Sequence, residues 1–336
     1  MDTYTLAIIL VVFASFFQGT FGLGMKYIAP LKWEAWWLVQ AFIAMIFVPV
    51  IWALIVIPDL FSVLANVDAS TFWTASLYGF LWGIGGILFG VSVEKTGISI
   101  TYGIVMGLAA SMGCIIPLFQ IDGAFSQPSF PIILVGVALL LVGVCITAIA
   151  GVKRDKLKSN NESSTNKSIK LGVLIAVASG VLSAFLNVGF SNAAPVAKIA
   201  VDSYGTSAQN ASLASWVVVL IGAFAMNGGY AIYRLAKNKT WNSFKVKNSK
   251  KAYIWAIATG IFWFAALGVY GQGAALMGDL GPVIGWPILL GLALIISNIW
   301  AYRSGEWNNA KGPFKILLGG LAVLISAICI LGYANY

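Results

Sequence analysis

Two adjacent stretches decide the fold: PIILVGVALLLVGVCITAIAG at Pro131–Gly151 and KRDKLKSNNESSTNKSIK at Lys153–Lys170. The first has no charged residue and is long enough, at about 1.5 Å per residue, to cross a hydrocarbon core of about 30 Å as one helix. The second is rich in lysine and serine, has no apolar pair, and is expected to be a flexible loop. The chain is therefore expected to span a membrane and to divide near its middle.

Apolar windows of the same length recur on both sides of this loop. The sequence predicts ten spans, at Thr5–Leu23, Trp36–Ile57, Phe72–Val93, Ile98–Phe119, Pro131–Gly151, Leu171–Phe190, Ser212–Leu235, Tyr253–Leu276, Pro282–Tyr302 and Pro313–Tyr333. The predicted fold class is an all-α polytopic membrane protein. Its predicted parts are a first five-helix repeat (1–151), a cytoplasmic loop (152–170) and a second five-helix repeat (171–336).

The composition excludes several classes of protein. Hydrophobic residues make up 60% of the chain and charged residues only 9%, whereas soluble domains carry roughly 25% charged residues. A soluble domain, a disordered chain, a secreted disulfide scaffold and a nucleic-acid-binding domain are therefore excluded. The chain has no histidine, so histidine bases, relays and metal ligands are absent. We expect no metal and no cofactor.

The basic residues predict the orientation in the bilayer. All of the 20 lysines and arginines except Lys198 fall in the loops that follow the odd-numbered spans. Since basic loops stay in the cytoplasm, these loops are expected to be cytoplasmic and both termini periplasmic. Orientation thus accounts for the net charge of +9; the alternative for the Lys245–Lys251 cluster is a site for lipid headgroups.

An odd number of spans in each half requires that two similar halves lie in opposite orientations, as in many secondary transporters. The sequence supports such an inverted repeat through residues of the third and eighth spans that recur at one constant offset. They are Gly79, Trp82, Phe89 and Gly90 in the third span and Gly260, Trp263, Tyr270 and Gly271 in the eighth.

Four residues are the leading candidates for a substrate site. Trp82 and Trp263 lie near the middle of their spans, away from the interfaces where tryptophan usually gathers. Their flat faces would suit the apolar face of a sugar ring, and core packing is the alternative. Gln18 and Asn187 are amides within spans, where they would recognise hydroxyl groups or, alternatively, form hydrogen bonds between helices.

A second group of candidates consists of Tyr102, Asn192, Asn227, Gln272 and Trp286. No charged residue lies near the middle of any span, so a site there is expected to take a small, neutral, polar ligand. Coupling to an ion then depends on carboxylates at the span ends, of which Glu94 and Glu34 are the candidates. Their alternative role is that of interfacial charges beside Lys95 and Lys32.

Several motifs resemble the L-rhamnose–proton symporter family of the drug/metabolite transporter superfamily. They are Lys26, Trp33-Glu34 with Trp37, the stretch Gly79–Gly85 continuing to Gly90 and Gly97-Ile98-Ser99, and the loop Glu306–Ala310. The resemblance spans nearly the whole chain and implies uptake of a 6-deoxyhexose with a proton across a bacterial inner membrane. The chain departs from the enterobacterial symporters at Gly271–Ala275, near which those proteins carry a histidine.

We therefore expect a secondary active transporter that takes up L-rhamnose or a related neutral deoxyhexose by alternating access, coupled to protons or, alternatively, to sodium. A small-metabolite exporter or an uncoupled facilitator of the same superfamily is the alternative. An enzyme is not expected, because the chain has no histidine, no Gly-x-Ser-x-Gly turn and no paired buried carboxylates. A channel is not expected either, since no ring of like charges is evident.

Overall fold

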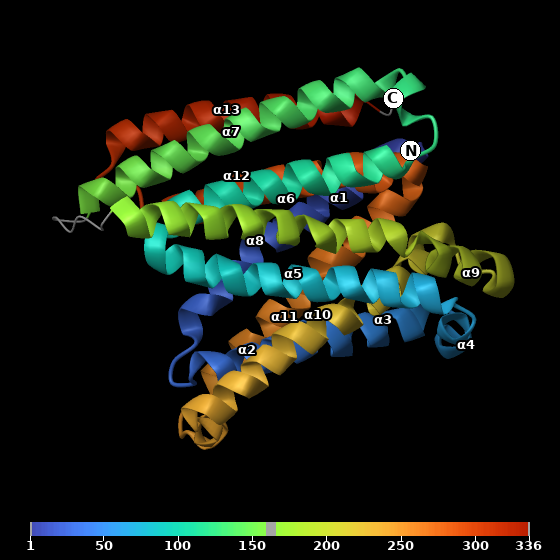
Figure 1. Ribbon diagram of the computed structural model, residues 1–336, viewed down its shortest axis with the longest axis horizontal. Helices are drawn as coiled ribbons and strands as arrows, with labels where there is room; N and C mark the ends of the chain where they lie inside the picture. Colours follow the sequence, from blue (N-terminus) through green and yellow to red (C-terminus); the bar gives the residue numbers. More distant parts are fainter. Residues whose placement is uncertain (1, 159–165, 335–336) are drawn as a thin grey trace. The chain divides into compact units, whose positions relative to one another are not determined.

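The structure is a computed structural model that describes residues 2–158 and 166–334, and these residues form helices and turns without strands (Figure 1). The chain divides into two compact units. The first unit comprises Met1–Gly83 and Gly189–Leu276, and the second comprises Ile84–Val188 and Met277–Tyr336. Each unit takes helices from both halves of the sequence, so the division into two inverted repeats stays a prediction.

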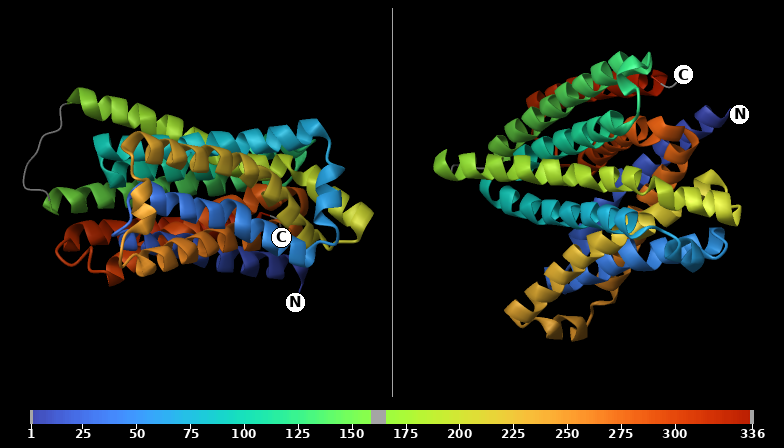
Figure 2. Two further views of the ribbon diagram at one scale, coloured as in Figure 1. Left: turned by 90° about the horizontal axis from the view of Figure 1, so that it is seen from below. Right: turned by 45° about the vertical axis from the view of Figure 1, so that its right-hand side comes forward.

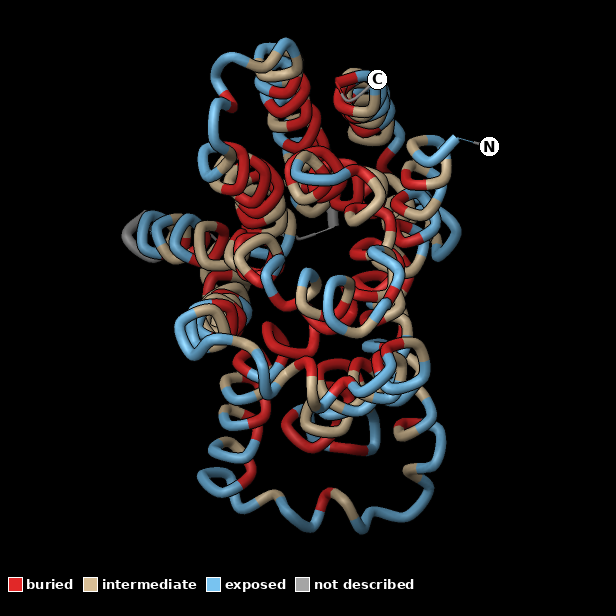
Figure 3. Tube along the Cα trace, turned by 90° about the vertical axis from the view of Figure 1, so that its right-hand side faces the viewer, coloured by how far each residue is buried: buried red, intermediate tan, exposed pale blue. Residues whose placement is uncertain are grey.

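The prediction of ten spans is confirmed: within the described residues, ten helical segments are long and apolar enough to cross a membrane. They are Thr3–Tyr27, Trp33–Val56, Ala69–Thr96, Ile98–Gln120, Ser129–Leu157, Ile169–Tyr204, Ala208–Asn238, Lys250–Leu276, Gly278–Arg303 and Lys311–Tyr333. Along the trace, buried residues lie in the helices, and exposed residues occur in the connections and on the helices as well (Figure 3). The protein is a multi-pass membrane protein.

The first unit is built from the following elements. They are α1 (Thr3–Thr20), η1 (Phe21–Tyr27), α2 (Trp33–Phe42), η2 (Ile43–Phe47), α3 (Val48–Val56), α4 (Leu60–Ala65), the first half of α5 (Ala69–Thr96), α9 (Ala194–Tyr204), α10 (Ala208–Asn238), η4 (Trp241–Lys245) and α11 (Lys250–Leu276). The second span is one continuous rod whose middle, η2, is a π-helix directly before Pro49. Proline cannot donate the usual backbone hydrogen bond, and a wider turn beside it accommodates that loss.

The sixth span is longer than predicted and is broken once. Helix α8 (Asn166–Asn192) ends in a turn at Ala193, and α9 continues with Pro195 in its first turn. The Ser215 hydroxyl donates to the carbonyl oxygen of Ala193 at 2.7 Å. A side chain therefore satisfies a carbonyl group at the break, as a buried helix end requires.

The second unit holds the rest of α5, α6 (Ile98–Gln120), η3 (Ala124–Ser126), α7 (Ser129–Lys158), most of α8, η5 (Gly278–Leu280), α12 (Gly281–Arg303) and α13 (Lys311–Tyr333). Helices α7 and α13 lie side by side along their lengths (Figures 1 and 2). A single residue, Gly97, connects α5 to α6 with a φ of 82°, a left-handed conformation that glycine adopts without strain.

The prediction that the whole stretch Lys153–Lys170 is a loop is wrong, because helices occupy both of its ends. Helix α7 continues to Lys158 and α8 starts at Asn166, and residues 159–165 lie outside the described part of the chain. After the apolar stretch Pro131–Gly151, α7 is stabilised by Arg154. Its guanidinium forms an ion pair with Glu306 at 3.1 Å and lies over the ring of Trp307, 4.8 Å from the ring centroid. Polar composition alone does not end a helix, because no proline or glycine interrupts its backbone bonds here.

Candidate substrate site

Helix α5 reaches the interior of the first unit because its backbone touches that of α10. A Cβ atom at Gly79 would collide with the carbonyl oxygen of Val219, and one at Gly222 would collide with that of Ser76. The Ser76 hydroxyl donates to the carbonyl oxygen of Val218 at 3.0 Å and fixes this contact. These small residues allow α5 and α10 to cross closely. The next turn of α5 therefore lies inside the first unit.

Trp82 lies on that turn and meets Trp263 of α11. The two ring centroids are 5.4 Å apart and the ring planes are tilted by 33°. Trp263 is only 6% exposed, whereas Trp82 is partly exposed. Trp82 and Trp263, which occupy matching positions in the two halves of the sequence, therefore form one aromatic pair in the first unit. The partly exposed ring of Trp82 offers an indole surface.

Gln18 lies at the same level of the unit. Its neighbour Phe17 packs edge-on against Phe262, the residue before Trp263, with 5.5 Å between the ring centroids. The Oε1 atom of Gln18 is buried and has no hydrogen-bond partner among the described residues. A buried acceptor of this kind costs about 1–3 kcal/mol unless a ligand or a water supplies a donor.

Two further acceptors of this kind surround the same part of α11, and sequence reasoning missed both. Gln40 and Thr259 are each 2% exposed, and the atoms Oε1 of Gln40 and Oγ1 of Thr259 have no partner among the described residues. The carbonyl oxygen of Gln40 lies 3.0 Å from where a Cβ of Gly260 would be. Gln40 could have been found, because it is an amide within a predicted span, as Gln18 is.

The other candidates of the first unit are Gln272 and Asn192. Gln272 donates to the Oδ1 of Asn210 at 3.1 Å. It follows Trp263 by nine residues on α11, which is about 14 Å along a helix axis. Asn192 is partly buried at the end of α8. Gln272 is therefore not brought to the Trp82–Trp263 pair, and the part of both residues in binding stays a prediction.

In the second unit, Asn187 joins two helices through its amide. Its Nδ2 donates to the carbonyl oxygens of Gly113 on α6 at 2.7 Å and of Pro282 on α12 at 2.8 Å. Pro117, four residues after Gly113, has no N–H to bond that carbonyl. Asn187 therefore has a clear structural role, and its contact with a substrate stays a prediction.

Trp286 and Tyr102 are also packed within the second unit. The Nε1 of Trp286 donates to the carbonyl oxygen of Ala109 at 3.0 Å, and the side chain is 3% exposed. Tyr102 meets Phe89 edge-on, with 6.4 Å between the ring centroids. The structure gives both residues partners inside the unit, and their part in binding stays a prediction.

The two candidate coupling carboxylates differ in their surroundings. Glu34, in the first turn of α2, is 4% exposed and is the only charged side chain classed as buried in the described residues. It accepts hydrogen bonds from Asn238 at 3.1 Å and from Thr240 at 2.6 Å, at the end of α10. Glu94 is exposed in the last turn of α5.

Comparison with known proteins identifies the family. The model of the L-rhamnose-proton symport protein (RhaT) family matches residues 1–335. The chain belongs to this family. RhaT proteins are transporters and not enzymes, in agreement with the resemblance in the sequence motifs.

Two RhaT relatives and one solved structure illustrate the similarity. An L-rhamnose-proton symporter of Escherichia coli is 27% identical over 318 residues, and one of Yersinia pestis is 24% identical over 316; each alignment covers 91% of both chains. A solved structure titled "Crystal structure of protein" has a TM-score of 0.60 at 13% identity and covers 96% of this chain and 94% of its own. That last likeness shows the fold alone.

Proposed function

We propose that the protein takes up L-rhamnose or a related neutral deoxyhexose together with a proton, by alternating access across a bacterial inner membrane. Membership of the RhaT family and the names of its relatives support sugar and proton as the two substrates. The predicted orientation places both termini in the periplasm.

The observation that carries the site is the Trp82–Trp263 pair together with three buried acceptors, on Gln18, Gln40 and Thr259, that have no partner among the residues the structure describes. A sugar has an apolar ring face and hydroxyl donors, and the pair offers an indole surface while the Oε1 of Gln18 offers an acceptor. Ligand sites typically combine an apolar lining with a few placed polar groups. No charged residue lies in this set, which favours a neutral ligand. We therefore assign Trp82, Trp263, Gln18, Gln40 and Thr259 to sugar binding.

Glu34 is the residue we assign to the proton. A symporter without histidine needs a carboxylate that changes between a sheltered and an exposed state. Glu34 is buried and its anion is stabilised by hydrogen bonds from Asn238 and Thr240. If those donors withdrew in another state of the transport cycle, the carboxylate would take up a proton.

Uptake of radiolabelled L-rhamnose into proteoliposomes with an inward proton gradient tests the function. The wild type should accumulate the sugar, and a protonophore should abolish the accumulation. Accumulation that survives the protonophore and needs a sodium gradient would replace the proton by sodium. Equilibration without accumulation would indicate a facilitator, and exchange of amino acids but not sugars would indicate a metabolite exporter.

Variants test the site assignments in the same assay. Trp82→Ala combined with Gln18→Ala should remove most uptake, whereas Trp73→Ala, a tryptophan of the same helix that is 69% exposed, should leave it intact. Glu34→Gln should lose accumulation but keep exchange of sugar for sugar, and Glu94→Gln should keep both. Full uptake by the double variant would refute the sugar site, and full accumulation by Glu34→Gln would refute the proton site.

A further inference from the structure

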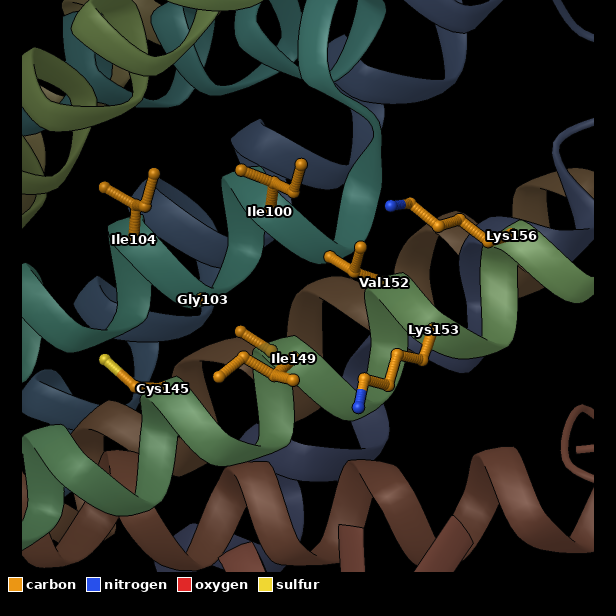
Figure 4. A pocket seen from close by; sticks show the side chains of 9 residues that line it. Ile100, Gly103, Ile104, Cys145, Ile149, Val152, Lys153 and Lys156 are labelled. Atoms are coloured by element: carbon orange, nitrogen blue, oxygen red, sulfur yellow. The ribbon is translucent and has the colours of Figure 1, made fainter. Parts of the chain in front are cut away.

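An elongated groove of about 450 Å³ runs along the outside of the second unit between α6 and α7 (Figure 4). Its lining comes from only two helices and consists of Ile100, Gly103, Ile104, Cys145, Ala148, Ile149, Val152, Lys153 and Lys156. The two helices approach closely here because a Cβ at Gly103 would collide with that of Ala148. Close packing at this point leaves a valley between the larger side chains on either side.

Most of the groove is apolar and open to the surroundings. Ile149 is 50% exposed, and the Cys145 thiol is exposed as well. An apolar valley on the surface of a membrane-spanning unit faces hydrocarbon, so a hydrocarbon chain is the ligand that its walls accept. Apart from the weakly polar thiol of Cys145, the side chains that line this part of the groove are apolar.

One end of the groove is positively charged. Figure 4 shows Lys153 and Lys156 next to Val152, one helical turn apart on α7, with the Lys156 side chain extending toward α6 and the Lys153 side chain extending in another direction. Among the described residues neither lysine has a carboxylate within salt-bridge distance. The nearby acids are engaged by Arg154, which bonds Asp155 at 2.9 Å and Glu306 at 3.1 Å. The charge at this end is therefore free for an external anion.

We propose that this groove is a binding site for an anionic phospholipid, with an acyl chain between α6 and α7 and the phosphate at Lys153 and Lys156. The flexible stems of lysines at a helix end let their ammonium groups reach the headgroup region. The basic end also lies on the side predicted to be cytoplasmic, the leaflet in which anionic lipids attract basic residues near a helix end. The site is separate from the proposed sugar site, which lies in the first unit.

Native mass spectrometry of the purified, delipidated full chain, titrated with phosphatidylglycerol and with phosphatidylcholine of the same acyl chains, tests the charged end. The wild type should retain one phosphatidylglycerol in preference to phosphatidylcholine. Lys153→Gln with Lys156→Gln should reduce that preference by about ten- to thirtyfold, since each lysine near a lipid surface contributes about 1 kcal/mol. The control, Lys311→Gln with Lys315→Gln, removes the same charge from two exposed lysines of α13 that do not line the groove and should keep the preference.

A second pair of variants tests the apolar part. Cys145→Trp should fill the groove and weaken retention of both lipids, while Cys329→Trp, at an exposed cysteine of α13 that does not line the groove, should change nothing. An unchanged phosphatidylglycerol preference in the lysine variant would overturn the proposal. Equal retention by the two tryptophan variants would overturn it as well, because the lipid would then bind elsewhere.

Discussion

The Nδ2 atom of Asn187 donates a hydrogen bond of 2.7 Å to the carbonyl oxygen of Gly113. In an uninterrupted helix that oxygen would accept from the residue four positions later, which here is Pro117 and has no N–H. The amide of α8 thus replaces a backbone bond that the sequence of α6 cannot make. A proline within a span is tolerated because a neighbouring helix satisfies the freed carbonyl group.

This relationship predicts the effect of removing the amide. Asn187→Leu should lower the free energy of unfolding by about 1–3 kcal/mol, because a buried carbonyl loses its donor. In a Pro117→Ala background the backbone N–H of residue 117 can supply that donor, so the same substitution should cost less. Thermal unfolding of the four proteins in one detergent gives the coupling. Equal costs in the two backgrounds would contradict the role of Asn187.

Removal of the buried acceptors of Gln40 and Thr259 is expected to weaken sugar binding without lowering stability. Gln40→Leu and Thr259→Val each remove a buried polar atom that has no partner in the described part of the chain, so stability in the absence of sugar should stay the same or rise. The apparent affinity for rhamnose should fall about two- to tenfold, the value of one lost hydrogen bond. Thr147→Val is the matched control, because that hydroxyl donates to the carbonyl oxygen of Val144 in its own helix. A loss of stability without a loss of affinity would assign both residues to packing.

The contacts of Arg154 predict that lysine at this position makes the protein less stable. Its guanidinium bonds Asp155 and Glu306 and stacks on Trp307 at once, which the point charge of an ammonium group cannot reproduce. Arg154→Lys should therefore lower the midpoint of thermal unfolding, with a cost of about 1 kcal/mol. Arg303→Lys, at an exposed arginine of α12, should have no effect. The same midpoint for both variants would refute the importance of this network.

The lowered pKa of Asp68 predicts that the contribution of this residue to stability depends on pH. Hydrogen bonds from the side chain and backbone N–H of Thr71 hold the pKa of Asp68 below its ordinary value of 3.8. Since the folded state has the lower pKa, the bond stabilises the start of α5 above that value and is lost as the pH falls through the lowered pKa. Asp68→Ala should thus lower the unfolding midpoint at neutral pH, and the difference from the wild type should shrink in acid. A constant difference across this range would show that the carboxylate charge is not involved.

Local chemistry explains which parts of the site were predictable. Trp82 and Trp263 were selected because tryptophan usually gathers at the membrane interfaces and not in the middle of a span, and the two rings do meet. Asn187 was selected by the same kind of reasoning, yet its amide supports α6 and α12. A sequence shows that an amide is buried, but it does not show whether a backbone carbonyl group has been left free beside it.

The sequence by itself determined the membrane class, the ten spans and the basic residues that predict orientation. These follow from hydrophobicity and charge, which act on each segment separately because every span must satisfy its own backbone within the bilayer. Only the tertiary structure decided that the helices group into two units that cut across the sequence halves. It also decided that, among the described residues, Asn187 has hydrogen-bond partners while the Oε1 of Gln40 and the Oγ1 of Thr259 have none. Those outcomes depend on which helices touch, and close contacts between small residues such as Gly79 and Gly222 decide that.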